Sequence, residues 1–315
     1  MGTPLFAVPP LQVLHNSTHH VIGVVTQPDR PVGRGQKVSP SPVKLAALEY
    51  YIPILQPEKL RNNLEFLQDL RELAPDIIVV AAYGKILPPA ILELPRFGCL
   101  NIHASLLPRH RGAAPITAAL LQGDTETGVT IMVMDAGMDT GPMLAKRALA
   151  IGAATTSDEL SQRLAQLGGP LLLECLIPWA NRAMTAEPQD HTRATYAPLV
   201  KKSDGLIRWQ LSPEELARSW RAYYPWPGLY TYHHDRLLKV QQLAVGEPST
   251  KGAPGEVLAV THAGLVVQCG QGTAVLQQVQ PAGGRIMSGD DYARGAHLEP
   301  GQILAPPPAM TGVAG

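Results

Sequence analysis

The feature of the sequence that most limits its fold is the apolar run at residues 77–82. The run reads Ile-Ile-Val-Val-Ala-Ala and follows a helix-breaking Pro75-Asp76 pair. A strand that is apolar on both faces is typical of a parallel sheet covered by helices on both sides. The chain around this run is therefore expected to alternate strands with helices.

That alternation extends over residues 21–181. Further strands are expected at 21–25, 99–103 and 129–134. Helices are expected at 42–50, 58–73, 114–121 and 157–181. Alternation of this kind predicts a doubly wound, Rossmann-like α/β domain, which we place at residues 1–187.

The pattern changes after residue 187. Residues 188–204 are polar and are expected to form an extended linker. One helix is expected at 213–223, and short strand-like runs separated by Gly and Pro follow at 237–243, 255–260, 264–268 and 274–280. Short strands at a spacing of about ten residues predict a small β-barrel over residues 205–305. The tail at 306–315 begins with three prolines and is expected to be disordered.

Charge and cysteine content exclude several classes of protein. Lys+Arg and Asp+Glu number 26 each, so a nucleic-acid partner would have to be held by a local basic patch. The three cysteines have no CxxC spacing, which argues against a disulfide framework and a metal site. No membrane-spanning run and no signal peptide are recognised, so we expect a cytoplasmic protein that does not enter a membrane.

Polar residues that could carry chemistry follow two of the expected strands. Asn101 and His103 are two apart and would project from the same face of strand 99–103, near its end. A second polar segment, Asp135 to Gly141, follows strand 129–134 and could reach the same edge of the sheet. An Asn that donates to an oxyanion, a His that moves a proton and an Asp that orients the His suit acyl transfer to an amine. Residue types alone leave a purely structural role for Asn-x-His open.

Several longer segments carry a family resemblance. They are Gly2-Thr3-Pro4 with Phe6-Ala7, Gln27 to Gly35, Asn101 to Pro115, Gly128 to Met132, Asp135 to Gly141 and Trp226-Pro227. Together they resemble the methionyl-tRNA formyltransferases, a branch of the folate-dependent formyltransferase family. The resemblance covers nearly the whole chain, and the combination is far more specific than any one segment.

The resemblance implies a 10-formyltetrahydrofolate donor, initiator methionyl-tRNA as acceptor and a role in translation initiation. It assigns catalysis to Asn101, His103 and Asp139. It assigns folate contact to Ser105, Leu106, Leu107 and Pro108, no metal, and an oligonucleotide-binding-like fold to the C-terminal barrel. We expect a monomer.

The loop after Asp29 is basic. Arg30, Arg34 and Lys37 follow one another with no acidic residue between them. The charges alone are compatible with a solvated surface loop. The resemblance implies instead that the loop enters the acceptor arm of the tRNA, with Arg34 at the position of the family's important arginine. The roles of Arg109, His110 and Arg111 stay open between anion contact and solvated charge.

One departure from the family concerns the N-terminus. Members normally have an apolar strand before Gly-Thr-Pro, whereas here Met1 directly precedes Gly2. The first strand of the sheet is therefore expected to be missing, with the true start of the chain upstream. Two alternatives remain: another folate-dependent formyltransferase or hydrolase, and a catalytically silent RNA-binding homologue.

Overall fold

The computed structural model describes residues 1–32 and 37–305. The chain divides into two compact units, which we describe separately. The first unit consists of residues 1–116, 125–153 and 159–199, and the second of residues 117–124, 154–158 and 200 onward. The predicted disordered tail and residues 33–36, which include Arg34, lie outside the described residues. None of the helices in the described ranges combines the length and apolar character needed to span a bilayer.

The helices of the described chain are α1 (Val8–His15), α2 (Pro42–Glu49), α3 (Leu64–Leu73), α4 (Pro89–Leu92), α5 (Pro115–Gln122), α6 (Ser157–Ala180), α7 (Pro213–Tyr223) and α8 (Gly289–Ala296). Short 3-10 helices occupy Leu5–Ala7, His191–Arg193 and Lys202–Gly205.

The strands are β1 (Val24–Val25), β2 (Arg30–Val32), β3 (Lys37–Ser39), β4 (Ile54–Leu55), β5 (Ile78–Val80), β6 (Cys99–His103), β7 (Arg111–Gly112), β8 (Glu126–Val133), β9 (Met143–Ala150), β10 (Tyr196–Ala197), β11 (Leu229–His233), β12 (Arg236–Val245), β13 (Val257–Thr261), β14 (Gly264–Gln268), β15 (Thr273–Pro281) and β16 (Met287–Ser288).

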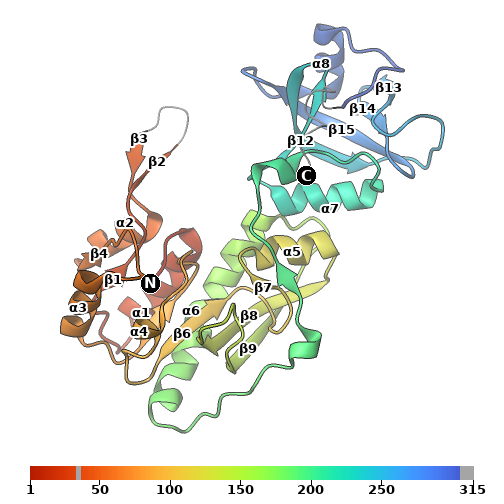
Figure 1. Cartoon of the computed structure of the whole chain (residues 1–315). Coiled ribbons are helices and arrows are strands. Elements are labelled where there is room, and N and C mark those ends of the chain that lie inside the picture. The colour runs from red at the N-terminus through yellow and green to blue at the C-terminus, as the bar shows by residue number, and fades with distance from the viewer. Residues whose placement is uncertain (33–36, 306–315) are drawn as a thin grey trace. The chain divides into compact units, whose positions relative to one another are not determined.

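The main sheet of the first unit has the order β5-β6-β8-β9 (Figure 1). β5 and β6 are parallel, as expected for the apolar run at 77–82. β8 is antiparallel to β6, and β9 is antiparallel to β8. The doubly wound α/β fold is therefore present with a mixed sheet. The direction of β8 could not be read from the apolar pattern, which does not distinguish parallel from antiparallel neighbours.

Met1 and Gly2 lie between β5 and β1, which itself pairs with β4 in parallel. The Gly2 amide donates to Val25 O at 3.0 Å, and the Ala81 amide donates to Met1 O at 2.9 Å. These two residues thus form a short central strand that joins the β1–β4 pair to the main sheet. Glycine is required at position 2, because a Cβ there would lie 2.5 Å from Ala7 Cβ and 2.8 Å from Ala81 O.

A cavity of 680 Å³ lies beside Met1 and Gly2, and residues of β1 and β5 form part of its wall. Apolar side chains of both strands and of α1 and α6 line it, among them Leu11, Val24, Ile78 and Leu176. The predicted strand 21–25 is reduced here to Val24–Val25, because only its final residues are paired, on the β4 side.

The polar strand β6 is held from both sides. Its residues are all buried, and β5 and β8 flank it. On the face opposite Asn101 and His103, Ile102 packs against α6 at Gly168, where a Cβ would lie 2.6 Å from Ile102 Cγ2. The sheet thereby gives Asn101 and His103 a rigid base.

The second unit is built around an antiparallel sheet in the order β11-β12-β15-β14-β13, with β16 paired to β15 (Figure 1). Its core includes Trp209, Leu238 and Leu276. The two edge strands of this sheet are joined through the chain end, since Leu304 bridges to His233 of β11 and Ile303 bridges to Glu256 beside β13. The antiparallel strands that the spacing predicted are therefore present, and residues 303–304 bridge to residues at both edges of their sheet.

The boundaries of several predicted elements agree closely with the structure, among them strands 99–103 and 264–268 and helix 213–223. The helix predicted at 58–73 is wrong in its first turns. It begins at Leu64, because the Asn63 side chain accepts from the Phe66 amide at 3.0 Å and caps it there.

The close approach of α6 to β6 leads to a prediction. Gly168→Ala should lower the free energy of unfolding by about 1–2 kcal/mol, because the clash with Ile102 outweighs the better helix propensity of alanine. Gly295→Ala in α8 is the control, since no atom lies within 4 Å of the added Cβ, and it should raise stability by up to about 1 kcal/mol. Calorimetric unfolding of both variants measures the difference. Equal stabilisation by both substitutions would contradict the packing described here.

Candidate active site

Asn101 and His103 project from the same face of β6, as their two-residue spacing predicted. Asn101 is 9% exposed and His103 is 5% exposed. Their partners across the sheet in β8 are Met132 and Thr130, respectively. A buried central strand holds both polar side chains with little freedom.

The loop 135–141 reaches these side chains by a route that the sequence did not predict. We expected it to leave its strand at the edge where β6 ends. Because β8 is antiparallel, Val133 lies beside Leu100, at the start of β6 rather than at its end. The loop returns over the sheet to place Asp139 against Asn101 and His103.

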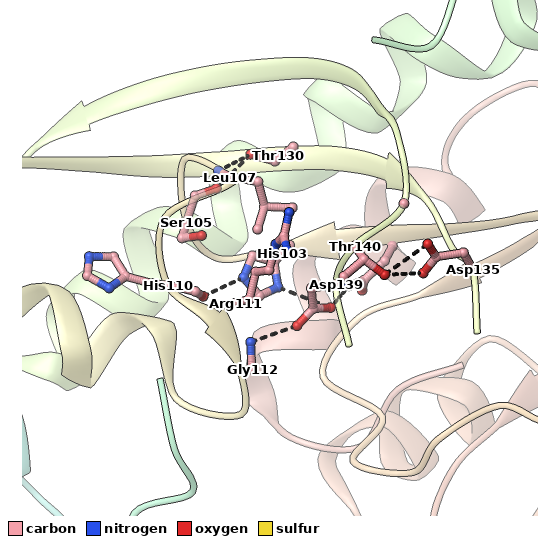
Figure 2. Close-up of polar contacts among 12 residues, drawn as sticks. His103, Ser105, Leu107, His110, Arg111, Gly112, Thr130, Asp135, Asp139 and Thr140 are labelled. Carbon is pink, nitrogen blue, oxygen red and sulfur yellow. Dashed lines mark hydrogen bonds and ion pairs between the residues drawn. The ribbon is translucent and has the colours of Figure 1, made fainter. Parts of the chain in front are cut away.

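Asp139 is the meeting point of the site (Figure 2). Its Oδ1 accepts from Asn101 Nδ2 at 3.3 Å and lies 3.6 Å from His103 Nδ1. Its Oδ2 accepts from the Gly112 amide at 2.8 Å. The Asp139 backbone has a φ of 53°, in the left-handed region that Asp tolerates better than most residues. The structure therefore brings together all three side chains that the family resemblance assigned to catalysis.

One hydrogen bond of the His103 ring shows which role its Nε2 atom takes. Nε2 lies 2.9 Å from the backbone oxygen of His110. A carbonyl oxygen can only accept, so Nε2 carries a proton and donates it. Nδ1 faces the Asp139 carboxylate.

The segment predicted to contact folate forms a tight turn after β6 (Figure 2). The Ser105 hydroxyl donates to Arg109 O at 2.6 Å, and the Leu107 amide donates to Thr130 Oγ1 at 3.1 Å. Thr130 Oγ1 in turn donates to Ser105 O at 2.7 Å. Ser105 and Leu107 are buried, while Leu106 and Pro108 are partly exposed.

The three residues whose roles stayed open have different environments. Arg109 is exposed, whereas His110 and Arg111 are buried. Arg111 is 1% exposed, so it is not a solvated charge. Its Nε and Nη2 donate to Gln189 Oε1 at 3.0 and 2.7 Å, and its Nη2 lies 3.1 Å from His191 Nδ1.

The basic loop is built on a hairpin of β2 and β3, in which Arg30 pairs with Ser39 (Figure 1). Arg30 is exposed, and Lys37 is the first residue of β3. At the base of the hairpin, Asp29 accepts from Lys44 Nζ at 2.7 Å and from Gln56 Nε2 at 2.8 Å. These hydrogen bonds hold the pKa of Asp29 below its usual range and anchor the hairpin.

Sequence reasoning assigned no role to Thr130, Gly112 or Gln189, although all three shape the site. A lone hydroxyl within the apolar run of β8 was a usable signal for Thr130. Gly112 contributes a backbone amide and Gln189 lies in a polar segment, so neither stands out in the sequence.

Metal-binding groups and reactive thiols are the other chemical features to consider. Within residues 1–32 and 37–305, no group of three or more His, Cys, Asp or Glu side chains is arranged to hold a metal ion. The cysteines Cys99, Cys175 and Cys269 are all buried, and burial raises the pKa of their thiols to about 12, 11 and 11. Buried, protonated thiols are poor nucleophiles.

Comparisons with known proteins show the family of the chain. Residues 1–176 match the family model described as formyl transferase, and residues 199–297 match formyl transferase, C-terminal domain. A methionyl-tRNA formyltransferase of Geobacter metallireducens is 48% identical over 301 residues, 96% of each chain. One of Citrifermentans bemidjiense is 46% identical over 313 residues, 99% of this chain and 98% of the relative.

The fold is also similar to that of a solved N-formyltransferase from Helicobacter canadensis in complex with folinic acid and dTDP-3-aminofucose. The TM-score is 0.62 at 17% sequence identity, over 87% of this chain and 96% of the other. At this identity the likeness concerns the fold alone.

The state of the cysteines gives a direct test of this picture. At pH 7–8 the native chain should react with none of its thiols, because their raised pKa values leave less thiolate than in a free cysteine. Titration with a chromogenic disulfide reagent should reveal all three only after denaturation. Rapid reaction of a thiol in the native chain would contradict the burial of that cysteine described here.

Proposed function

The chain belongs to the formyl transferase family, and we propose that it transfers the formyl group of 10-formyltetrahydrofolate to the α-amino group of methionine on initiator methionyl-tRNA. It is a transferase of translation initiation. The two family models span both units, and relatives at 43–48% identity over 96% or more of this chain carry the name methionyl-tRNA formyltransferase. The observation that carries the proposal is the convergence of Asn101, His103 and Asp139.

In the proposed reaction the methionyl α-amine attacks the formyl carbon. A C–N bond forms to the amine, and negative charge develops on the formyl oxygen. Among its described contacts, Asn101 Nδ2 uses one N–H bond on Asp139, so its second N–H is available for that oxygen. A donor that is already fixed in a buried strand needs little reorganisation in the transition state.

The amine must also lose a proton. His103 Nδ1 is the ring nitrogen that exchanges a proton, and Asp139 stabilises the cation that results. When the tetrahedral intermediate collapses, the bond between the formyl carbon and N10 of the folate breaks. The proton taken from the amine is then delivered to N10, so that His103 and Asp139 return to their starting state.

The turn 105–108 is proposed to contact the folate. Leu106 and Pro108, which keep exposed surface, would touch the donor directly. Ser105 and Leu107 are buried and would shape the turn through Thr130. The arrangement supports contact through backbone groups and apolar surface rather than through the Ser105 hydroxyl, which is engaged with Arg109 O.

The basic hairpin is proposed to contact the tRNA, through Arg30, Arg34 and Lys37. Arg30 is exposed on β2, directly after Asp29, which Lys44 anchors. Phosphate groups are the natural partners of an exposed arginine. With an aminoacylated tRNA as its substrate, the proposed reaction would take place in the cytoplasm.

The catalytic proposal is tested by His103→Ala, Asp139→Ala and Asn101→Ala. We expect kcat to fall by about 10²–10⁴-fold for the first two and by about 10²–10³-fold for the third, because proton transfer and oxyanion stabilisation are removed. The assay follows labelled formyl from 10-formyltetrahydrofolate to charged initiator tRNA, with free methionine and glycinamide ribonucleotide as competing acceptors.

His262→Ala is the matched control, since His262 is exposed at the turn between β13 and β14 and should leave turnover unchanged. Wild-type turnover in folded His103→Ala or Asp139→Ala would remove these residues from the mechanism. Preferred formylation of glycinamide ribonucleotide would assign the chain a different acceptor.

The tRNA contact is tested by substituting Arg30, Arg34 and Lys37 together with alanine. We expect KM for tRNA to rise and kcat to change little. The slope of log KM against log salt should shrink by about 0.7–0.9 for each phosphate that the variant no longer neutralises. Arg71→Ala on α3 is the control, because Arg71 is also exposed but lies outside the hairpin. An unchanged KM and salt slope in the triple variant would exclude the hairpin from tRNA binding.

A further inference from the structure

The three convergent side chains are supported from behind by a buried Gln–Arg pair. Gln189 is 5% exposed and Arg111 is 1% exposed, and 78 residues separate them in the sequence. Both lie within the first unit. What this pair does bears on the proposed reaction, and the inference below rests on the proposed function.

Every hydrogen-bonding group of the Gln189 side chain is used. Its Oε1 accepts from Arg111 Nε and Nη2, and its Nε2 donates to Asp139 O at 2.8 Å and to Gly141 O at 2.7 Å. A carboxamide offers two N–H donors and one oxygen with two lone pairs. All hydrogen-bonding groups of the side chain are therefore occupied within the protein, and none is left to bind a substrate.

Arg111 determines which way the carboxamide points. A guanidinium can only donate, so the oxygen of Gln189 must face it. The NH₂ group must then face the backbone oxygens of Asp139 and Gly141, which can only accept. The reverse orientation would oppose donors to donors on one side and acceptors to acceptors on the other.

The contacts of Gln189 fall on the loop that carries Asp139. Asp139 has a left-handed backbone, which is less favourable for a non-glycine residue than the common regions. At the other side of the loop, the Thr140 hydroxyl donates to the Asp135 carboxylate at 2.8 Å. Gln189 fixes the two backbone oxygens around Thr140, and so fixes the direction in which the Asp139 carboxylate leaves the loop.

Gln189 is itself held by pairing on either side of it. The backbone of Glu187 exchanges two hydrogen bonds with Met143, each 2.8 Å long. Further along, Tyr196 and Ala197 form β10, which pairs with Arg111 and Gly112 of β7. One chain segment, residues 187–197, is thus bound both to the end of the Asp139 loop and to the strand that supplies the Gly112 amide.

We propose that Gln189, oriented by Arg111, is a positioning residue for catalysis, which holds the loop 135–141 so that the Asp139 carboxylate meets His103 and Asn101. Gln189 does not touch the reacting atoms. It acts through the backbone of Asp139.

Gln189→Glu separates this role from the burial of Arg111. A glutamate at position 189 still offers Arg111 an acceptor, but it places a carboxylate oxygen against the two loop carbonyls in place of an NH₂ donor. Gln189→Met would remove both functions and leave the Arg111 cation buried without its main acceptor, so it can fail by unfolding. Gln12→Glu on the exposed face of α1 is the matched control for the chemical change.

We expect Gln189→Glu to remain folded, to lower kcat by about 10- to 100-fold and to change KM for tRNA less than twofold, since small displacements of a catalytic group have effects of this size. In an Asp139→Ala background the same substitution should cost little more, because the group that Gln189 positions is already absent. If Gln189 had only a structural role, the substitution would lower kcat by the same factor with and without Asp139→Ala.

A second readout does not depend on catalysis. The Gly112 amide donates to Asp139 Oδ2, whereas the neighbouring Ala113 amide donates to Ala197 O at 2.9 Å. In Gln189→Glu, hydrogen exchange at Gly112 should accelerate by tenfold or so relative to Ala113, as Asp139 loses its fixed position. This result stands even if the chain proves to formylate another acceptor or none.

Three results would overturn the proposal: wild-type kcat in Gln189→Glu, an equal loss in the Asp139→Ala background, or unchanged exchange at Gly112. If the unsubstituted chain showed no formyl transfer, the proposed function would be overturned instead. The rate of hydrogen exchange at the Gly112 amide would still decide the role of Gln189.

Discussion

The site depends on one constraint, the need to hold a largely buried carboxylate in a fixed direction. The Asp139 side chain is 17% exposed, and a carboxylate withdrawn from water must be given hydrogen-bond donors by the protein. Asn101 and the Gly112 amide supply them, and the His103 ring faces the same oxygen as Asn101. The central position of β6, the β7–β10 pairing and the returning loop after β8 all serve to bring these donors to one point.

Local patterns were sufficient to predict the parts of the site that lie on one strand. The two-residue period of β6 placed Asn101 and His103 on a common face, and the strand bounds agree with the structure. The wider fold followed from alternating apolar runs and from short strands separated by Gly and Pro. Asp139 was reached through the family resemblance, because nothing in the residues 135–141 alone shows that the loop folds back over an antiparallel neighbour.

The features that escaped prediction share a physical cause, which is dependence on distant partners. In the sequence, nothing distinguishes Arg111 from a surface arginine. In the structure it is buried, and Gln189, 78 residues away, accepts its hydrogen bonds and so offsets part of the cost of burial. The strand at 21–25 has the right composition yet is formed only where β4 and Gly2 supply hydrogen bonds. Helix α3 begins at a cap rather than where its apolar pattern begins. Propensity describes what a segment can form, and its partners decide how much of it forms.

The segment 187–197 shows that the geometry of the site does not depend on the three proposed catalytic residues alone. Sequence composition suggested a linker there, because the segment is polar and lacks an apolar period. Its polar groups bond to the rest of the first unit. Gln189 donates to the backbone of Asp139, Thr195 O accepts from the Arg111 amide, and Ala197 O accepts from the Ala113 amide. A chain that ended before this segment would still contain Asn101, His103 and Asp139. It would lack the groups that orient Asp139 and half of the pairing that presents Gly112. The arrangement of Asn101, His103 and Asp139 therefore forms only when residues on either side of α6 have come together, so the proposed chemistry depends on the completed fold of the first unit.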